Sequence, residues 1–179
     1  MSADASSPLA ASAPPIAMMY GDFEAEHAAT RRMLERFPDA HRDWRPHEHS
    51  RTIAELATHI ADIPNRAVAI LTTDVMDAGA RKPIAPVGTA VELLAMHDAS
   101  VAAQKRALAE ANPAELSKEW TIRRGGQVAM RGPKYQLLRT VMMSHLIHHR
   151  AQLSVYYRLL GVSVPGMYGP SADDLAGRK

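Results

Sequence analysis

The sequence predicts an all-α fold: a four-helix bundle with a short β-hairpin between its third and fourth helices. Three observations predict it. Apolar residues recur at helical spacing in four segments of about twenty residues. One stretch alternates apolar and polar residues around a Gly-Gly pair. Hydrophobic residues make up 46% of the chain but aromatic residues only 5%, which predicts a largely aliphatic core.

The length of 179 residues fits one domain with a tail. We expect residues 1–16, which are rich in Ala, Ser and Pro, to be a disordered N-terminal tail. Residues 17–174 then form the bundle domain, and residues 175–179 a flexible C-terminus. The first segment lacks the basic and apolar regions of a signal peptide, and no apolar run approaches the roughly 18 residues that cross a bilayer. We therefore expect a cytoplasmic protein that does not bind membranes.

Charge and cysteine content exclude several classes of function. The net charge is +2 with mixed signs, and no basic helix carries interleaved aromatic residues, so we expect no nucleic-acid binding. The chain has no cysteine. This excludes disulfides, cysteine–metal sites and a thiol nucleophile provided by the protein.

Periodic apolar residues and signals at the helix ends predict the first two helices. The first spans about residues 17–37, and Pro38 marks its end. A polar loop follows. The second spans about residues 52–73, with Thr52 and Glu55 at capping-box spacing. Pro64 lies inside this segment, where it is expected to kink the helix.

The last two helices flank the hairpin. The third spans about residues 89–110, and the fourth begins near Pro133, runs to about residue 160 and stops at Gly161. The residues expected on the inner face of the third helix are Ala90, Leu94, His97, Val101 and Leu108.

Two registers are open to the hairpin. A two-residue Gly-Gly turn pairs Ile122 with Ala129. A three-residue loop over residues 124–126 instead pairs Ile122 with Val128 and Trp120 with Met130. We favour the second register because it puts four large apolar side chains on one face, which would cover one end of the bundle.

Histidines on the fourth helix indicate a metal site. His145 and His149 are spaced i and i+4, so their side chains share a face and could bind one ion. Spacing favours this pair but leaves a pair of His145 with His148 open. A third ligand must come from another helix, where His59 is the best candidate and His97 its rival. Leu146 stands where a zinc peptidase of the H-E-x-x-H type has its glutamate, which disfavours that class.

Two stretches, "WRPHEHSRTIAELATHIADIP" and "HLIHHRAQLSVYYRLLGVSVPGMYGPSADD", resemble the DinB family, and the resemblance extends from Met18 to Asp174. It implies a four-helix bundle, often dimeric, in which three histidines hold a divalent metal. Carried over, these positions fall on His59, His145 and His149. The resemblance also implies a metal-dependent transferase or isomerase that uses a low-molecular-weight thiol such as bacillithiol or mycothiol, and a homodimer.

Three histidines without a fourth protein ligand leave an open coordination position, which is typical of catalytic sites. We expect Zn or Ni, with Fe or Mn as alternatives. Such an ion ionises a thiol or lowers the pKa of water to about 7. The functional hypothesis is a metal-dependent enzyme that transfers a low-molecular-weight thiol to a small electrophile, or a related metal-assisted hydrolase. The alternative is a non-catalytic, stress-response bundle that binds metal or ligand.

Further residues are candidates for supporting roles. Glu55, Gln152 and Tyr156 could orient the imidazoles, although a helix cap or core polar groups would explain them equally well. Arg124 and Arg131 on the hairpin could contact an anionic substrate or simply be solvated. Tyr168 could border the substrate pocket or pack against the bundle.

Overall fold

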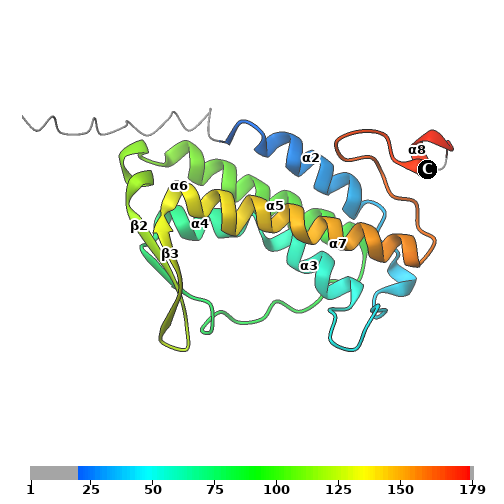
Figure 1. The fold of residues 1–179 in the computed structure, drawn as a ribbon, viewed down its shortest axis with the longest axis horizontal. Coiled ribbons are helices and arrows are strands. Elements are labelled where there is room, and N and C mark those ends of the chain that lie inside the picture. Colours follow the sequence, from blue (N-terminus) through cyan, green and yellow to red (C-terminus); the bar gives the residue numbers. More distant parts are fainter. Residues whose placement is uncertain (1–19, 178–179) are drawn as a thin grey trace, which may run out of the picture.

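The computed structural model describes residues 20–177 and shows a mostly helical fold with a small three-stranded sheet at one end (Figure 1). The predicted tail, the start of the first predicted helix and residues 178–179 lie outside the described residues. The helices are α2 (Phe23–Leu34), α3 (Ile53–Asp62), α4 (Asn65–Thr72), α5 (Ala90–Glu110), α6 (Lys134–Leu137), α7 (His145–Leu159) and α8 (Ala172–Leu175). The strands are β1 (Val75–Asp77), β2 (Glu119–Arg124) and β3 (Gln127–Pro133).

The long helices pack around an aliphatic core. Helix α3 contacts both α5 and α7, α4 contacts α5, and α2 lies across α5 and α7 (Figure 1). The core includes fully buried aliphatic side chains from α2, α3, α4 and α7, as the composition predicted; among them are Leu34, Ile53, Ile60, Ile70 and Leu153. Between residues 20 and 177, every helix is too short or too polar to cross a membrane.

The predicted second helix is divided in two at Pro64. Helix α3 ends at Asp62 and α4 begins at Asn65, because proline has no N–H to donate to the preceding turn. The capping box at the start of α3 is present. Glu55 N donates to Thr52 Oγ1 at 3.1 Å, and Thr52 N donates to Glu55 Oε2 at 2.7 Å. This cap fixes where α3 starts, and with it the position of His59.

The predicted fourth helix is continuous but not uniform. A π-helical turn over Leu138–Ser144 joins α6 to α7. Such a turn holds about one more residue than an α-helical turn and is frequent at functional sites. It buries Val141, Met142 and Met143 in succession, which an α-helical stripe does not do. The turn ends immediately before His145.

The favoured hairpin register is wrong. The turn has two residues, Gly125 and Gly126, and both have positive φ angles (57° and 80°), as the tight hairpin turn requires. A bulge then leaves Ala129 unpaired, so that Ile122 pairs with Met130 rather than with Val128. Gly-Gly supplies the unusual φ angles without strain, and the bulge absorbs the extra residue.

The four-residue apolar face is therefore not formed. Trp120 is fully buried, and its Nε1 donates to Thr73 Oγ1 at 3.0 Å. Val128 and Met130 are 49% and 43% exposed. In addition, β1 pairs in parallel with β2, so the fold contains a three-stranded sheet and is not purely α. Strand β1 has three residues, too few to show an alternating pattern.

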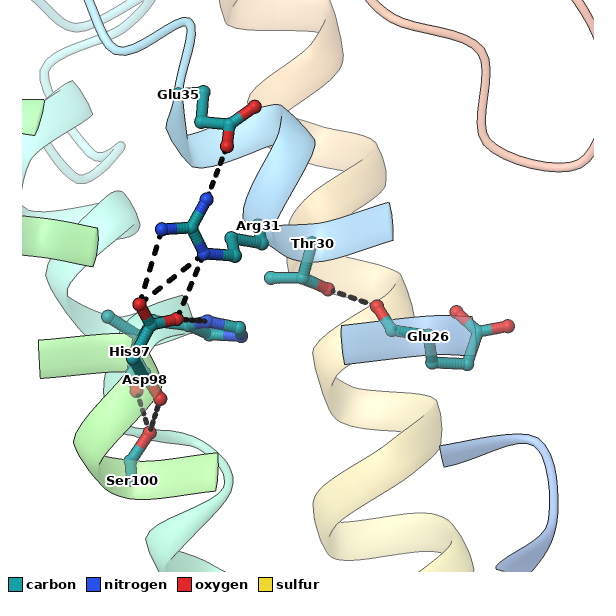
Figure 2. Close-up of polar contacts among 8 residues, drawn as sticks. Glu26, Thr30, Arg31, Glu35, His97, Asp98 and Ser100 are labelled. Carbon is teal, nitrogen blue, oxygen red and sulfur yellow. Dashed lines mark hydrogen bonds and ion pairs between the residues drawn. The ribbon is translucent and has the colours of Figure 1, made fainter. Parts of the chain in front are cut away.

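The inner face of α5 matches the prediction in part and is unexpectedly polar. The predicted His97 is buried, and the predicted Ala90, Leu94 and Leu108 are partly buried and pack against the core. The other buried side chains are Leu93, Ser100, Gln104 and Ala107. Ser100 Oγ donates to the carbonyl of Ala61 at 2.6 Å, and Arg31 on α2 pairs with Asp98 beside it at 3.1 Å (Figure 2). Because several residues on the buried face are polar, the pattern of apolar residues identified this face only in part.

Candidate metal centre

Three histidines from two helices converge at the contact between α3 and α7. His59 Nε2 lies 3.3 Å from His145 Nε2, and His149 Nε2 lies 2.7 Å from the same atom. One ring nitrogen of each residue lies within 4.8 Å of the others. All three side chains are half-buried. Among residues 20–177, no carboxylate or further histidine joins this group.

The backbone explains the convergence. His145 and His149 are one helical turn apart on α7, so their side chains lie one above the other. His59 stands on α3 next to Ile60, at the edge of the face that α3 buries. Because α3 packs on α7, this edge directly faces the pair.

Hydrogen bonds to the outer nitrogens indicate the tautomer of two rings. His145 Nδ1 lies 3.2 Å from the carbonyl oxygen of Val141, and His149 Nδ1 lies 2.7 Å from Gln152 Oε1. Both partners are acceptors, so each Nδ1 carries the proton and each Nε2 presents a lone pair. The lone pairs therefore point at one another, an arrangement that a cation between them would stabilise.

The surroundings keep the three rings neutral. Burial, followed by the charge of Arg51, lowers the pKa of His59 to about 3. Burial, followed by the charge of Arg66, lowers the pKa of His145 to about 4, and burial also lowers the pKa of His149. Neutral imidazole is the form that binds metal.

These residues fit a divalent ion. Two imidazole nitrogens that bind one tetrahedral ion at 2.0–2.1 Å lie roughly 3.3 Å apart. The nitrogens of His59 and His145 already have this separation, and those of His145 and His149, at 2.7 Å, lie somewhat closer together. Three neutral ligands from the protein also leave a position open to another molecule.

The rival ligands lie elsewhere. His97 is buried on α5, with its ring centroid 5.9 Å from that of His27 and its Nδ1 3.5 Å from Asp98 Oδ1 (Figure 2). His148 is exposed, and its ring centroid lies 4.9 Å from that of His149. Neither belongs to the group of three.

Of the three residues predicted to orient the imidazoles, one contacts a site histidine and the other two bond elsewhere. Gln152 contacts His149, as described above. The Glu55 carboxylate accepts from Thr52 N as part of the helix cap. Tyr156 donates to the carbonyl of Arg51 at 3.4 Å and packs edge-on against Trp44.

The predicted substrate contacts lie outside the site. Arg124 is exposed next to the hairpin turn, and Arg131 pairs with Glu119 at 3.4 Å. Tyr168 bonds instead to a buried ion pair, at 2.7 Å from Arg150 Nη2 and 3.0 Å from Glu26 Oε2.

A cavity of about 450 Å³ lies beside His59, and four cationic side chains line it. They are Arg51, Arg66, Arg81 and Lys82. None of the four was predicted from the sequence. One signal was available for Arg66, which follows His59 by seven residues and so falls on the same helical face. Arg81 and Lys82 lie in the Gly/Pro-rich connection, whose path the sequence pattern does not reveal.

Comparison with known proteins places the chain in a family. The family model of the DinB family matches residues 8–179. The chain belongs to the DinB family. Among curated proteins, none matches this DinB protein.

Two solved DinB-like structures share the fold. A DinB-like protein from Bacillus cereus ATCC 10987 has a TM-score of 0.65 and 21% identity; the match covers 84% of this chain and 95% of that one. A DinB-like protein from Bacillus subtilis, YjoA, has a TM-score of 0.63 and 20% identity, with 84% and 96% covered. At these identities the likeness concerns the fold of the DinB protein and not its chemistry.

Proposed function

We propose that this DinB-family protein is a metal-dependent enzyme in which His59, His145 and His149 hold one divalent ion. The observation that supports this most directly is the convergence of three neutral imidazoles, two with Nε2 lone pairs directed at a common point. Zn or Ni suits three imidazoles best, with Fe or Mn as alternatives.

The proposed reaction is transfer of a low-molecular-weight thiol to a small electrophile, or a related hydrolysis. When bound, the ion supplies a positive charge that favours the ionised form of a thiol or of water. The chain has no cysteine, so a reacting thiol must belong to a small molecule. The residues of the chain hold the site in place. The Val141 carbonyl and Gln152 orient two rings, and the cavity beside His59 has room for a small molecule.

The test is turnover. The purified protein is loaded with Zn or Ni and incubated with a panel of low-molecular-weight thiols and a chromogenic aryl halide, and in parallel with an activated ester. We expect product formation that requires the metal and is lost in His145→Ala. Thioether formation supports thiol transfer, whereas ester cleavage alone supports the hydrolase. A metal-loaded protein with neither activity above the uncatalysed rate would overturn the enzyme proposal in favour of a binding protein.

A further inference from the structure

We infer that the cavity beside His59 binds an oxyanion of the substrate, a carboxylate or a phosphate, through Arg51 and Arg66. The inference rests on the proposed function, because it concerns the molecule whose reactive group would reach the three histidines. It adds that this molecule is an anion.

The charges that line the cavity are unbalanced. Its two carboxylates are Glu55 and Asp62. Glu55 accepts from Thr52 N in the cap of α3, and Asp62 is buried and bonded to Arg81 Nη2 at 2.6 Å and to Asn65 Nδ2 at 3.1 Å. Both carboxylates therefore already accept hydrogen bonds from other groups of the protein.

Within residues 20–177, the side chains of Arg51 and Arg66 form no ion pair and donate no hydrogen bond. The charge of Asp62 acts on Arg66 from a distance, but the Asp62 carboxylate is itself bonded to Arg81 and Asn65. Arg66 is half-buried, and its Nε is buried without an acceptor. Burial, together with the nearby charge of Arg81, lowers the pKa of Arg66. A desolvated guanidinium with an unmade hydrogen bond is unfavourable, and a carboxylate or phosphate supplies the missing charge and acceptors.

Both arginines lie within electrostatic reach of the histidines. Arg51, Arg66 and His59 line the same cavity, and His59 Nε2 lies 3.3 Å from His145 Nε2. A divalent ion at these histidines would add two further positive charges to the same region. An anionic substrate offsets this repulsion, whereas a neutral substrate does not.

The far wall of the cavity is apolar and held in place. It is formed by Pro83, Ile84 and Pro86. This segment is attached to α3 at both ends, by the pair of Arg81 with Asp62 and by Val87 N, which donates to Thr58 Oγ1 at 2.8 Å. The wall therefore favours a ligand with an apolar body behind its charged group.

Calorimetric titration of the full chain tests the inference with three probes: succinate, inorganic phosphate and the neutral succinamide. We expect succinate or phosphate to bind and succinamide not to bind. Arg66→Gln and Arg51→Gln should each weaken anion binding at least tenfold. Arg106→Gln should not, because Arg106 is an exposed arginine on α5 outside this cavity. Whichever anion binds more tightly identifies the group as carboxylate or phosphate.

Three outcomes would overturn the inference: no anion binding to the wild type, equal binding of succinamide, or equal anion affinity in Arg66→Gln. Circular dichroism checks that the variants fold, and Arg66→Lys, which keeps the charge, should retain part of the affinity. The titrations are repeated after metal removal and with His145→Ala. Arginine-dependent anion binding by a protein that shows no metal-dependent turnover would leave this inference standing while the proposed function fails. Metal-dependent turnover with unchanged anion affinity in Arg66→Gln would support the proposed function and overturn this inference.

Discussion

The Nε2 atoms of His145 and His149 lie 2.7 Å apart on adjacent turns of α7, and the outer nitrogen of each ring faces a hydrogen-bond acceptor. The acceptors assign the protons to Nδ1, so two lone pairs face each other. Three neutral rings at the junction of α3 and α7 thus form a cluster that could hold a metal ion.

Gln152 should tune that site without binding the metal. Its Oε1 accepts from His149 Nδ1 at 2.7 Å, which orients the ring. Gln152→Leu removes this acceptor, and loss of such a partner lowers metal affinity by about 10–100-fold. Competition with a metal-binding dye measures the change. Gln136→Leu, at an exposed position before the π-helical turn, is the matched control and should keep wild-type affinity. Equal affinities in the two variants would rule out a role for Gln152.

The buried histidines between α2 and α5 should make stability depend on pH. His27 is 5% exposed, and burial, followed by the charge of His97, lowers its pKa to about 4. Burial also lowers the pKa of His97. Unfolded histidine titrates near 6.5, so between these values the unfolded chain binds a proton that the folded chain excludes. The contribution of the buried, neutral His27 to the free energy of unfolding is therefore fully present above about pH 6.5. It decreases as the pH falls towards 4.

Urea unfolding in the presence of a chelator measures this effect. From about pH 7.5 to about pH 5, wild type should lose about 2 kcal/mol more free energy of unfolding than His27→Leu, because the variant has no proton to bind at this position. His41→Leu, at an exposed position in the short 3-10 helix after α2, is the control and should follow the wild-type curve. Parallel curves for wild type and His27→Leu would contradict the prediction.

The pair of Arg150 with Glu26 should contribute strongly to stability. Arg150 is buried, and its Nη2 donates to Glu26 Oε2 at 2.6 Å. Arg150→Met leaves a buried carboxylate without its counterion and should cost about 3–5 kcal/mol. Arg31→Met breaks the exposed pair with Asp98 and should cost much less, because solvent screens that pair (Figure 2). Chemical denaturation compares the two, and similar losses would show that burial of the pair does not matter.

The hairpin turn should require glycine at its second position. Gly126 has a φ angle of 80°, which costs a residue with a side chain about 1–2 kcal/mol. Gly126→Ala should therefore lower stability by about that amount, while Gly126→Asn should lower it less, because asparagine tolerates this conformation. Thermal unfolding measures both. An unchanged melting temperature in Gly126→Ala would indicate a different turn.

The sequence predicted those features that depend on interactions between residues close together in the chain. The i,i+4 spacing of His145 and His149, the cap at Thr52 and the break at Pro64 all follow from interactions within a few residues. The choice of His59 over His97 required the packing of α3 on α7, and there the family resemblance provided what the spacing left open.

Other features depended on the rest of the fold. The hairpin register was wrong because a bulge at Ala129 shifted the pairing, and no residue pattern marks that bulge. Strand β1 exists because β2 lies beside it. The cations of the cavity were missed because the segment with Arg81 and Lys82 folds back over α3, a position set by its contacts with Asp62 and Thr58.

The most direct test of the metal centre is the metal content of three purified proteins, measured by elemental analysis after saturation with Zn or Ni and removal of excess. Wild type and His148→Ala should each retain about one ion per chain, because His148 is exposed outside the group of three. His149→Ala should lose the ion, because one of three ligands is gone. If His148→Ala loses the metal while His149→Ala retains it, or if wild type binds none, the assignment of His59, His145 and His149 is wrong.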